Sequence, residues 1–186
     1  MFKYFVLSLI IFVSCTNQYK ADYEVQAELQ MIDTLNARLQ TVKGWLDKMS
    51  LEEIQERKDI IKHNYTYCDA QYREQGLVID EETSRLVDEY KNYGKIYGRA
   101  ADSFKPIVME LEELFIQLKT LKESAHSKEY EKGTFLTYFA KEKEDALKLY
   151  GFAETVLKPV VDTDLAFERC QKNVEELAES LKTGQK

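Results

Sequence analysis

The strongest constraint on this chain is an apolar repeat between residues 80 and 125. Its members are separated alternately by four and three residues for five and a half heptads. An α-helix keeps such positions on one face, and a run of this length is typical of a helix that packs along its whole length against partner helices. The members of this seam are Leu86, Tyr90, Tyr93, Tyr97, Ala100, Phe104, Ile107, Leu111, Leu114, Leu118, Leu121 and Ala125.

Local signals mark where this helix begins. Asp80 stands just before Glu81 and Glu82, so it can cap the helix N-terminus while the two acids face the positive end of the helix dipole. Gly76 lies just upstream, where a glycine can end the preceding helix. These signals predict a short turn over residues 75–79.

A second seam follows a predicted turn over residues 126–133. It steps by four and three in the same way, with Glu142 and Thr163 as polar interruptions, and Thr134 is a reasonable cap. Its members are Phe135, Phe139, Glu142, Ala146, Leu149, Ala153, Val156, Val160, Thr163, Phe167, Cys170, Val174, Leu177 and Leu181.

The first segment, residues 22–74, is less regular. One apolar face runs from Val25 to Met49, and a second begins at Ile54 after a step of five residues. Ser50 with Glu53 matches a capping box, which predicts a new helix start. Alternatively, one helix continues through an insertion that changes its winding. Because no Gly or Pro sits at the junction, we favour a continuous or nearly continuous helix.

Three helical arms with short turns predict an all-α fold, an elongated antiparallel three-helix bundle resembling a coiled coil. At about 1.5 Å per residue, arms of this length are roughly 70 Å long. Pro106 and Pro159 lie within the seams, where each removes an internal hydrogen bond, so we expect the rod to bend there. The bundle is assigned to residues 22–182, and residues 183–186 form a flexible tail.

Cys68 and Cys170 test this topology. Counting residues from the two turns places both at nearly the same level of the rod, and both occupy seam positions. We therefore expect a disulfide between them, which would add on the order of 4 kcal/mol of stability. The alternative is two free buried thiols that act as small core residues.

Few residues carry chemistry. The chain has two histidines, His63 and His126, so a zinc site or a histidine-based triad is not expected. Glu123 and His126 match one Glu-x-x-His element of di-iron bundles, but no second element exists. The formal charge of −7 and the lack of a basic block exclude nucleic-acid binding. We expect no cofactor and no enzymatic activity.

Tyr90, Tyr93 and Tyr97 lie together with Gly94 and Gly98 in the segment YKNYGKIYG. One interpretation is a partner or ligand surface, because tyrosines are common at interfaces and glycines permit close approach. The other is a core position for all three rings, with the hydroxyls reaching the edge of the bundle. The seam pattern favours the core.

The N-terminal residues have the features of an export signal. Lys3 precedes an apolar run from Tyr4 to Phe12, which is too short to span a bilayer but has the length of a signal-peptide core. Val13, Ser14 and Cys15 follow, and this arrangement resembles the lipobox of bacterial lipoprotein signal peptides. The resemblance covers residues 1–15, and Phe12 is bulkier than the usual leucine.

The resemblance implies cleavage after residue 14 and attachment of lipid to Cys15. Several acyl chains would hold the protein stably on a membrane, and residues 15–21 would form the lipidated cysteine and a tether. Thr16 in place of an aspartate implies the outer membrane, facing the periplasm. We therefore expect a non-enzymatic, lipid-anchored helical scaffold or adaptor that binds an envelope protein. The alternative is a helical lipoprotein that binds a small or hydrophobic ligand between its helices.

Overall fold

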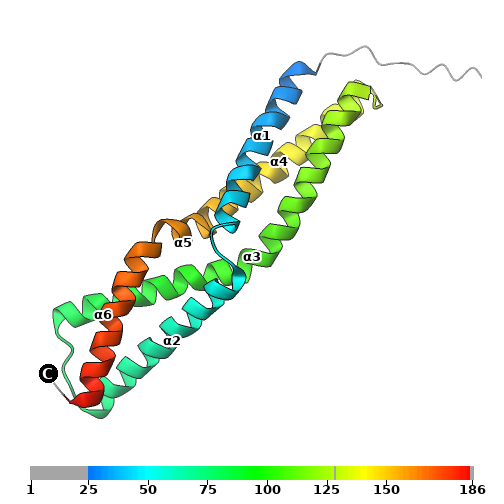
Figure 1. The fold of residues 1–186 in the computed structure, drawn as a ribbon. Coiled ribbons are helices and arrows are strands. Elements are labelled where there is room, and N and C mark those ends of the chain that lie inside the picture. Colours follow the sequence, from blue (N-terminus) through cyan, green and yellow to red (C-terminus); the bar gives the residue numbers. More distant parts are fainter. Residues whose placement is uncertain (1–24, 128, 185–186) are drawn as a thin grey trace, which may run out of the picture.

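The computed structural model describes residues 25–127 and 129–184, which form an all-α helical bundle (Figure 1). The expected signal sequence and Cys15 lie outside the described residues. Within the described ranges the chain forms helices and no strand. The helices are α1 (Gln26–Leu46), α2 (Leu51–Glu74), α3 (Glu81–Ser127), α4 (Lys132–Val156), α5 (Lys158–Asp162) and α6 (Asp164–Thr183).

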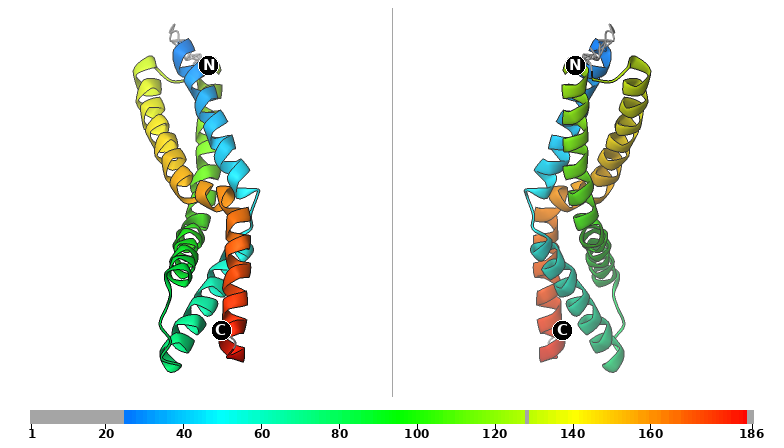
Figure 2. Two further views of the ribbon diagram at one scale, coloured as in Figure 1. Left: turned by 90° about the vertical axis from the view of Figure 1, so that its left-hand side faces the viewer. Right: turned by 90° about the vertical axis from the view of Figure 1, so that its right-hand side faces the viewer.

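The bundle is a rod made of two lobes joined end to end. In the proximal lobe, α1 and α4 pack on each other and on the C-terminal half of α3. In the distal lobe, α2 and α6 pack on each other and on the N-terminal half of α3. The start of α1 lies at the proximal end, whereas the α2–α3 loop and the end of α6 lie at the distal end (Figure 2). The long helix α3 therefore serves as the shared spine.

The first arm is two helices, so our preference for a continuous helix was wrong. The capping box at Ser50 explains the break: Ser50 Oγ accepts a hydrogen bond from the Glu53 N–H, and Glu53 Oε2 accepts one from the Ser50 N–H at 2.7 Å. These bonds satisfy two groups at the new helix start. Met49, just before it, is buried, so the apolar step of five residues is absorbed in a turn.

The other two arms change direction at the same level. Helix α3 contains Pro106 and bends sharply in its middle, as expected (Figure 1). The third arm goes further than a bend, because α4 ends at Val156 and the single turn of α5, which contains Pro159, leads into α6. Together with residues 47–50, these two regions form the joint between the lobes.

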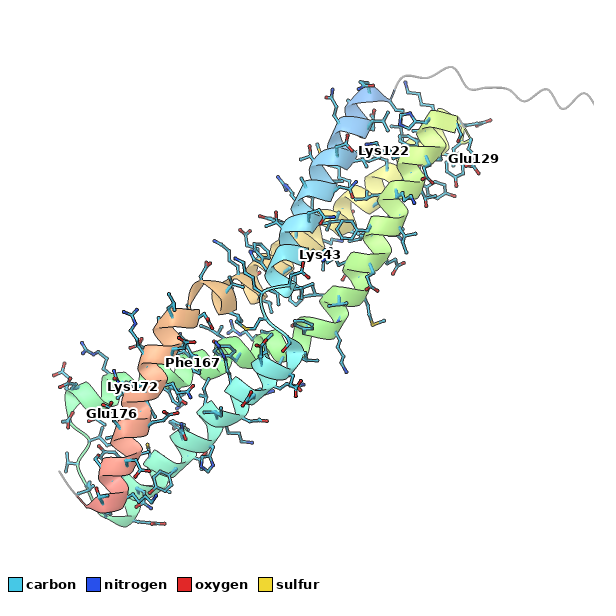
Figure 3. The ribbon with its side chains drawn as sticks, viewed as in Figure 1. Lys43, Lys122, Glu129, Phe167, Lys172 and Glu176 are labelled. Atoms are coloured by element: carbon cyan, nitrogen blue, oxygen red, sulfur yellow. The ribbon has the colours of Figure 1, made fainter. Side chains whose placement is uncertain are left out.

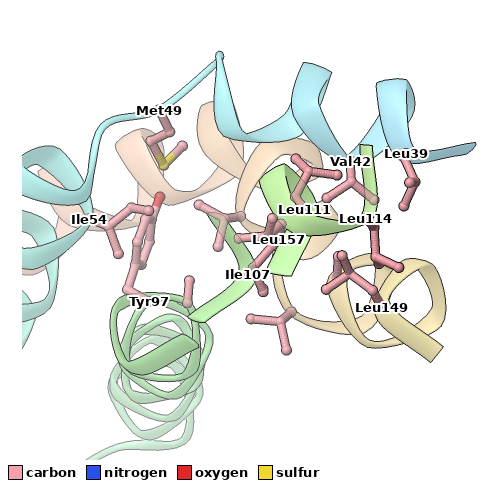
Figure 4. Close-up of a cluster of buried hydrophobic side chains, with 14 of the residues drawn as sticks. Leu39, Val42, Met49, Ile54, Tyr97, Ile107, Leu111, Leu114, Leu149 and Leu157 are labelled. Carbon is pink, nitrogen blue, oxygen red and sulfur yellow. The ribbon is translucent and has the colours of Figure 1, made fainter. Parts of the chain in front are cut away.

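The apolar core is continuous through the joint. Met49, Ile54 and Tyr97 on the distal side meet Ile107 and Leu157, and the core then extends into the proximal lobe (Figure 4). Most members of the two long seams are buried. The remaining members are partly buried, and they are Leu86, Phe104, Phe139, Thr163 and Leu177. The heptad pattern thus identified the core correctly.

The helix caps were predicted in part. Asp80 Oδ1 accepts a hydrogen bond from the Thr83 N–H at 2.8 Å, and Gly76 adopts a left-handed φ of 62° after α2, both as expected. Thr134 is not a cap, because α4 already begins at Lys132, after Glu131. Helix α6 reaches Thr183, one residue beyond the predicted end of the bundle.

The split at Ser50 gives a stability prediction. Ser50→Ala removes the acceptor for the Glu53 N–H and should lower the free energy of unfolding by about 1 kcal/mol. Thr41→Ala is the control, since it removes an exposed hydroxyl from the middle of α1 and should change stability by less than about 0.5 kcal/mol. Urea denaturation followed by circular dichroism measures both. Equal effects of the two substitutions would contradict a structural role for the capping box.

Candidate functional site

The three tyrosines of the sequence-based site lie in the core of the distal lobe, not on its surface. Tyr90, Tyr93 and Tyr97 are at most 6% exposed and surround the ring of Phe167. Phe167 lies on α6 in the distal lobe (Figure 3). The ring centroids of Tyr97 and Phe167 are 4.9 Å apart in an edge-on arrangement, and Tyr90 stacks on Phe167 at 6.2 Å. An exposed partner surface at these tyrosines is therefore wrong, and the core interpretation is correct.

The tyrosine hydroxyls reach the edge of the bundle, where each has a polar partner. Tyr90 accepts a hydrogen bond from Asn64 at 3.3 Å, and Tyr93 donates one to Glu89 at 3.2 Å. Of the two glycines in this segment, Gly94 allows the close approach of α2, because a Cβ atom there would lie 3.1 Å from Ile61. The segment is thus specialised for tight packing of α3 against α2 and α6.

Arg57 ties the three helices of the distal lobe together beside the joint. Its guanidinium donates to the Tyr97 hydroxyl at 2.8 Å and forms an ion pair with Asp164, the first residue of α6. It also lies over the rings of Tyr97 and Phe167, with its central carbon 5.7 and 5.3 Å from their centroids. The half-buried guanidinium therefore contacts side chains of both α3 and α6, and Arg57 links α2 to these two helices.

The disulfide predicted between Cys68 and Cys170 is wrong, because both cysteines are buried free thiols. Cys68 lies on α2 and Cys170 on α6, both in the core of the distal lobe. Burial raises the pKa of both thiols, that of Cys170 to about 11. Disulfide formation proceeds through the thiolate, which this apolar surrounding disfavours at neutral pH.

Two shallow grooves follow the line between α2 and α6. One has a volume of about 300 Å³ and is bordered by Arg57, Phe167 and Glu168; the other, of about 480 Å³, is bordered by His63, Tyr67 and Glu179. Charged side chains form most of the border of the smaller groove, the larger groove has a mixed border, and the buried tyrosines line neither groove. The geometry is that of a helix–helix surface groove and not of an enclosed apolar ligand cavity.

The remaining candidates for chemistry are dispersed. His63 is exposed midway along α2 in the distal lobe, whereas Glu123 and His126 are exposed near the end of α3 in the proximal lobe. Among residues 25–127 and 129–184, no three His, Cys, Asp or Glu side chains gather in a way that could hold a metal ion. Glu142 is buried in the proximal lobe, where Lys141 pairs with its Oε1 atom at 3.2 Å.

Sequence reasoning overlooked the loop at the distal end. The Leu77 N–H bonds back to the Tyr72 carbonyl at 3.0 Å, and Gly76 bonds to Arg73, so the loop is closed onto the end of α2. Val78, next in the loop, is 85% exposed and Ile79 is 46% exposed. The signal was present in the sequence as GLVID, three apolar residues within a turn, where polar residues are usual.

Comparison with known proteins gives no further guide. No family model, curated protein or solved structure matches the chain. None of the helices within the described part of the chain is long and apolar enough to cross a membrane. The assignment of function therefore depends on this chain's own residues.

The buried hydroxyl of Tyr90 predicts a specific loss of stability in base. Burial raises its pKa to about 12, whereas a tyrosine in an unfolded chain ionises near pH 10. The folded state holds this proton more tightly, so the stabilisation is complete below about pH 10 and is lost as the pH rises towards 12. Tyr90→Phe, which cannot ionise, should reduce the fall in urea midpoint over this range. Tyr138→Phe, which changes an exposed ring, is the control and should leave the dependence of the urea midpoint on pH as in the wild type. The same dependence in Tyr90→Phe as in the wild type would contradict a raised pKa for the Tyr90 hydroxyl.

Proposed function

We propose that this protein is a non-enzymatic, lipid-anchored scaffold or adaptor of the bacterial cell envelope. Lipid on Cys15 holds one end of the rod at a membrane. Thr16 in place of an aspartate favours the outer membrane, with the protein facing the periplasm. The helical rod then carries its distal end to an envelope protein.

One observation carries this proposal. The N-terminal end of α1 and the exposed α2–α3 loop lie at opposite ends of the rod (Figure 2). Helix α3 alone has 47 residues, about 70 Å of helix measured along its bent axis. A chain tethered before α1 therefore presents the distal loop far from its attachment point. A spacer needs this arrangement, whereas an enclosed catalytic site does not.

The filled interior supports the scaffold over the alternative, a carrier for a ligand between the helices. Phe167 and the three tyrosines occupy the space between α3 and α6 where a ligand was expected. Binding there would require the displacement of a well-packed aromatic ring, which costs several kcal/mol. The grooves beside α6 lie on the surface, and charged residues such as Arg57, Glu175 and Lys182 border them, which is unlike an enclosed apolar cavity.

The anchor is tested at Cys15. Cys15→Ala removes the only sulfur to which lipid could be attached at this position, so incorporation of an alkyne fatty acid during growth should be abolished. Ser14→Ala, a small residue before the cysteine, is the control and should still be labelled. The measurement is in-gel detection of the labelled protein. Undiminished label in the Cys15→Ala protein would rule out the anchor.

The spacer role is tested by shortening the rod. Lys122 on α3 forms an ion pair with Asp33 on α1, and Gln117 on α3 borders the same groove as Lys141 on α4. These pairs identify residues of the three helices that lie at the same level of the proximal lobe. Deletion of residues 35–41, 114–120 and 137–143 removes one heptad from each helix and should shorten the rod by roughly 10 Å while it stays helical.

We expect the shortened protein to lose its function in the envelope. The His63→Ala and His126→Ala proteins should keep full function. Circular dichroism verifies that the shortened protein is folded. The reverse, an active short rod and an inactive folded histidine variant, would favour a chemical site instead of a spacer.

A further inference from the structure

The distal loop presents its apolar residues in a fixed geometry. It is closed onto α2 by the bonds of Gly76 and Leu77, and Leu77 packs against the core. At its other side Asp80 caps α3. With both ends held, Val78 and Ile79 lose little conformational entropy when they bind a partner, which favours affinity.

An acidic groove of about 1150 Å³ begins at Ile79 and follows the first turns of α3. Five carboxylates and one guanidinium border it. These are Asp80, Glu81, Glu82, Asp88, Glu89 and Arg85. The acids of the first turn also compensate the helix dipole, but that effect fades beyond one turn and does not account for Asp88. Glu89 accepts the hydrogen bond of Tyr93 and keeps its charge. With five carboxylates and one guanidinium, the groove has an excess of negative charge.

A smaller cleft opens on the other side of Ile79, between α2 and α3. Its volume is about 170 Å³, and Tyr65, Tyr72 and Val87 line it together with Ile79. This border is more apolar than that of the acidic groove. Ile79 thus lies between a cleft suited to an apolar side chain and a groove suited to positive charge.

We propose that the distal tip, defined as Val78, Ile79 and the acidic groove of α3, is a docking site for a basic protein segment with an apolar anchor. The anchor side chain packs against Ile79 in the cleft, and lysines or arginines of the partner face Glu81, Glu82 and Asp88. Charge complementarity of this kind determines specificity and speeds association. The inference deepens the proposed adaptor function, because it specifies the chemistry of the partner.

Charge selects this occupant over two others. A second copy of the chain would place one acidic groove against another, and like charges facing each other are unfavourable. An anionic lipid surface would be repelled in the same way. A basic protein segment is the occupant that satisfies both the exposed apolar pair and its acidic border.

The test uses the purified full chain and a phage-displayed library of random 16-residue peptides. Enriched peptides should carry a net positive charge and at least one large apolar residue. Their binding should weaken at least tenfold in Val78→Ser/Ile79→Ser and in Glu81→Gln/Glu82→Gln, and also as salt rises from 50 to 500 mM. Met109→Ser/Leu165→Ser, which removes two apolar side chains that are 70% and 73% exposed elsewhere, is the matched control and should bind as the wild type does.

Several results would overturn the proposal. Peptides that are acidic or uncharged, or that bind the tip variants as tightly as the wild type, would exclude this docking site. Sedimentation that reveals self-association lost in Val78→Ser/Ile79→Ser would assign the tip to a second copy. Binding to phosphatidylcholine vesicles that depends on Val78 would assign it to a membrane. Because none of these assays measures lipid attachment, their failure is distinct from failure of fatty-acid labelling at Cys15.

Discussion

The structure depends on one constraint: the apolar seam of α3 must stay buried on both sides of its bend. Pro106 removes one internal hydrogen bond and redirects the helix, so a straight partner could not follow both halves. The partners are accordingly divided, with α1 and α4 on one half and α2 and α6 on the other. Ile107, Leu157 and Met49 keep the core continuous where the three arms change direction.

The three arms break or bend at the same level of the rod, but each does so for a different local reason. Ser50 forms a reciprocal cap, Pro106 bends a helix that remains continuous, and Pro159 lies in a single turn between two helices. Had the breaks been staggered, each bent helix would have lost its neighbour over several turns and exposed apolar side chains. Arg57 reinforces the joint from the distal side, because its partners come from both α3 and α6.

The sequence predicted those features that depend on periodicity and missed those decided by competition between local signals. Tyr97 and Leu118 were placed in the core because a seam of this length has one consistent face. The split at Ser50 was ambiguous, since a cap can form only if the step of five residues is accommodated by tertiary packing, here by burial of Met49. The level of Cys68 and Cys170 followed from counting residues, but their redox state depends on the surroundings of each sulfur. The tip was overlooked because exposure of Val78 is a property of the folded loop.

The polar groups of the distal lobe support the scaffold that we propose. Arg57 and the hydroxyls of Tyr90 and Tyr97 lie beside the core of the distal lobe, and each is engaged by a neighbouring helix. Catalysis requires instead that such groups converge on a space that a substrate can enter. In the distal lobe these groups hold α2, α3 and α6 together, while the exposed apolar residues of the α2–α3 loop lie at the end of that lobe. In the proposed scaffold, interior side chains maintain the length and shape of the rod, and recognition is left to its surface.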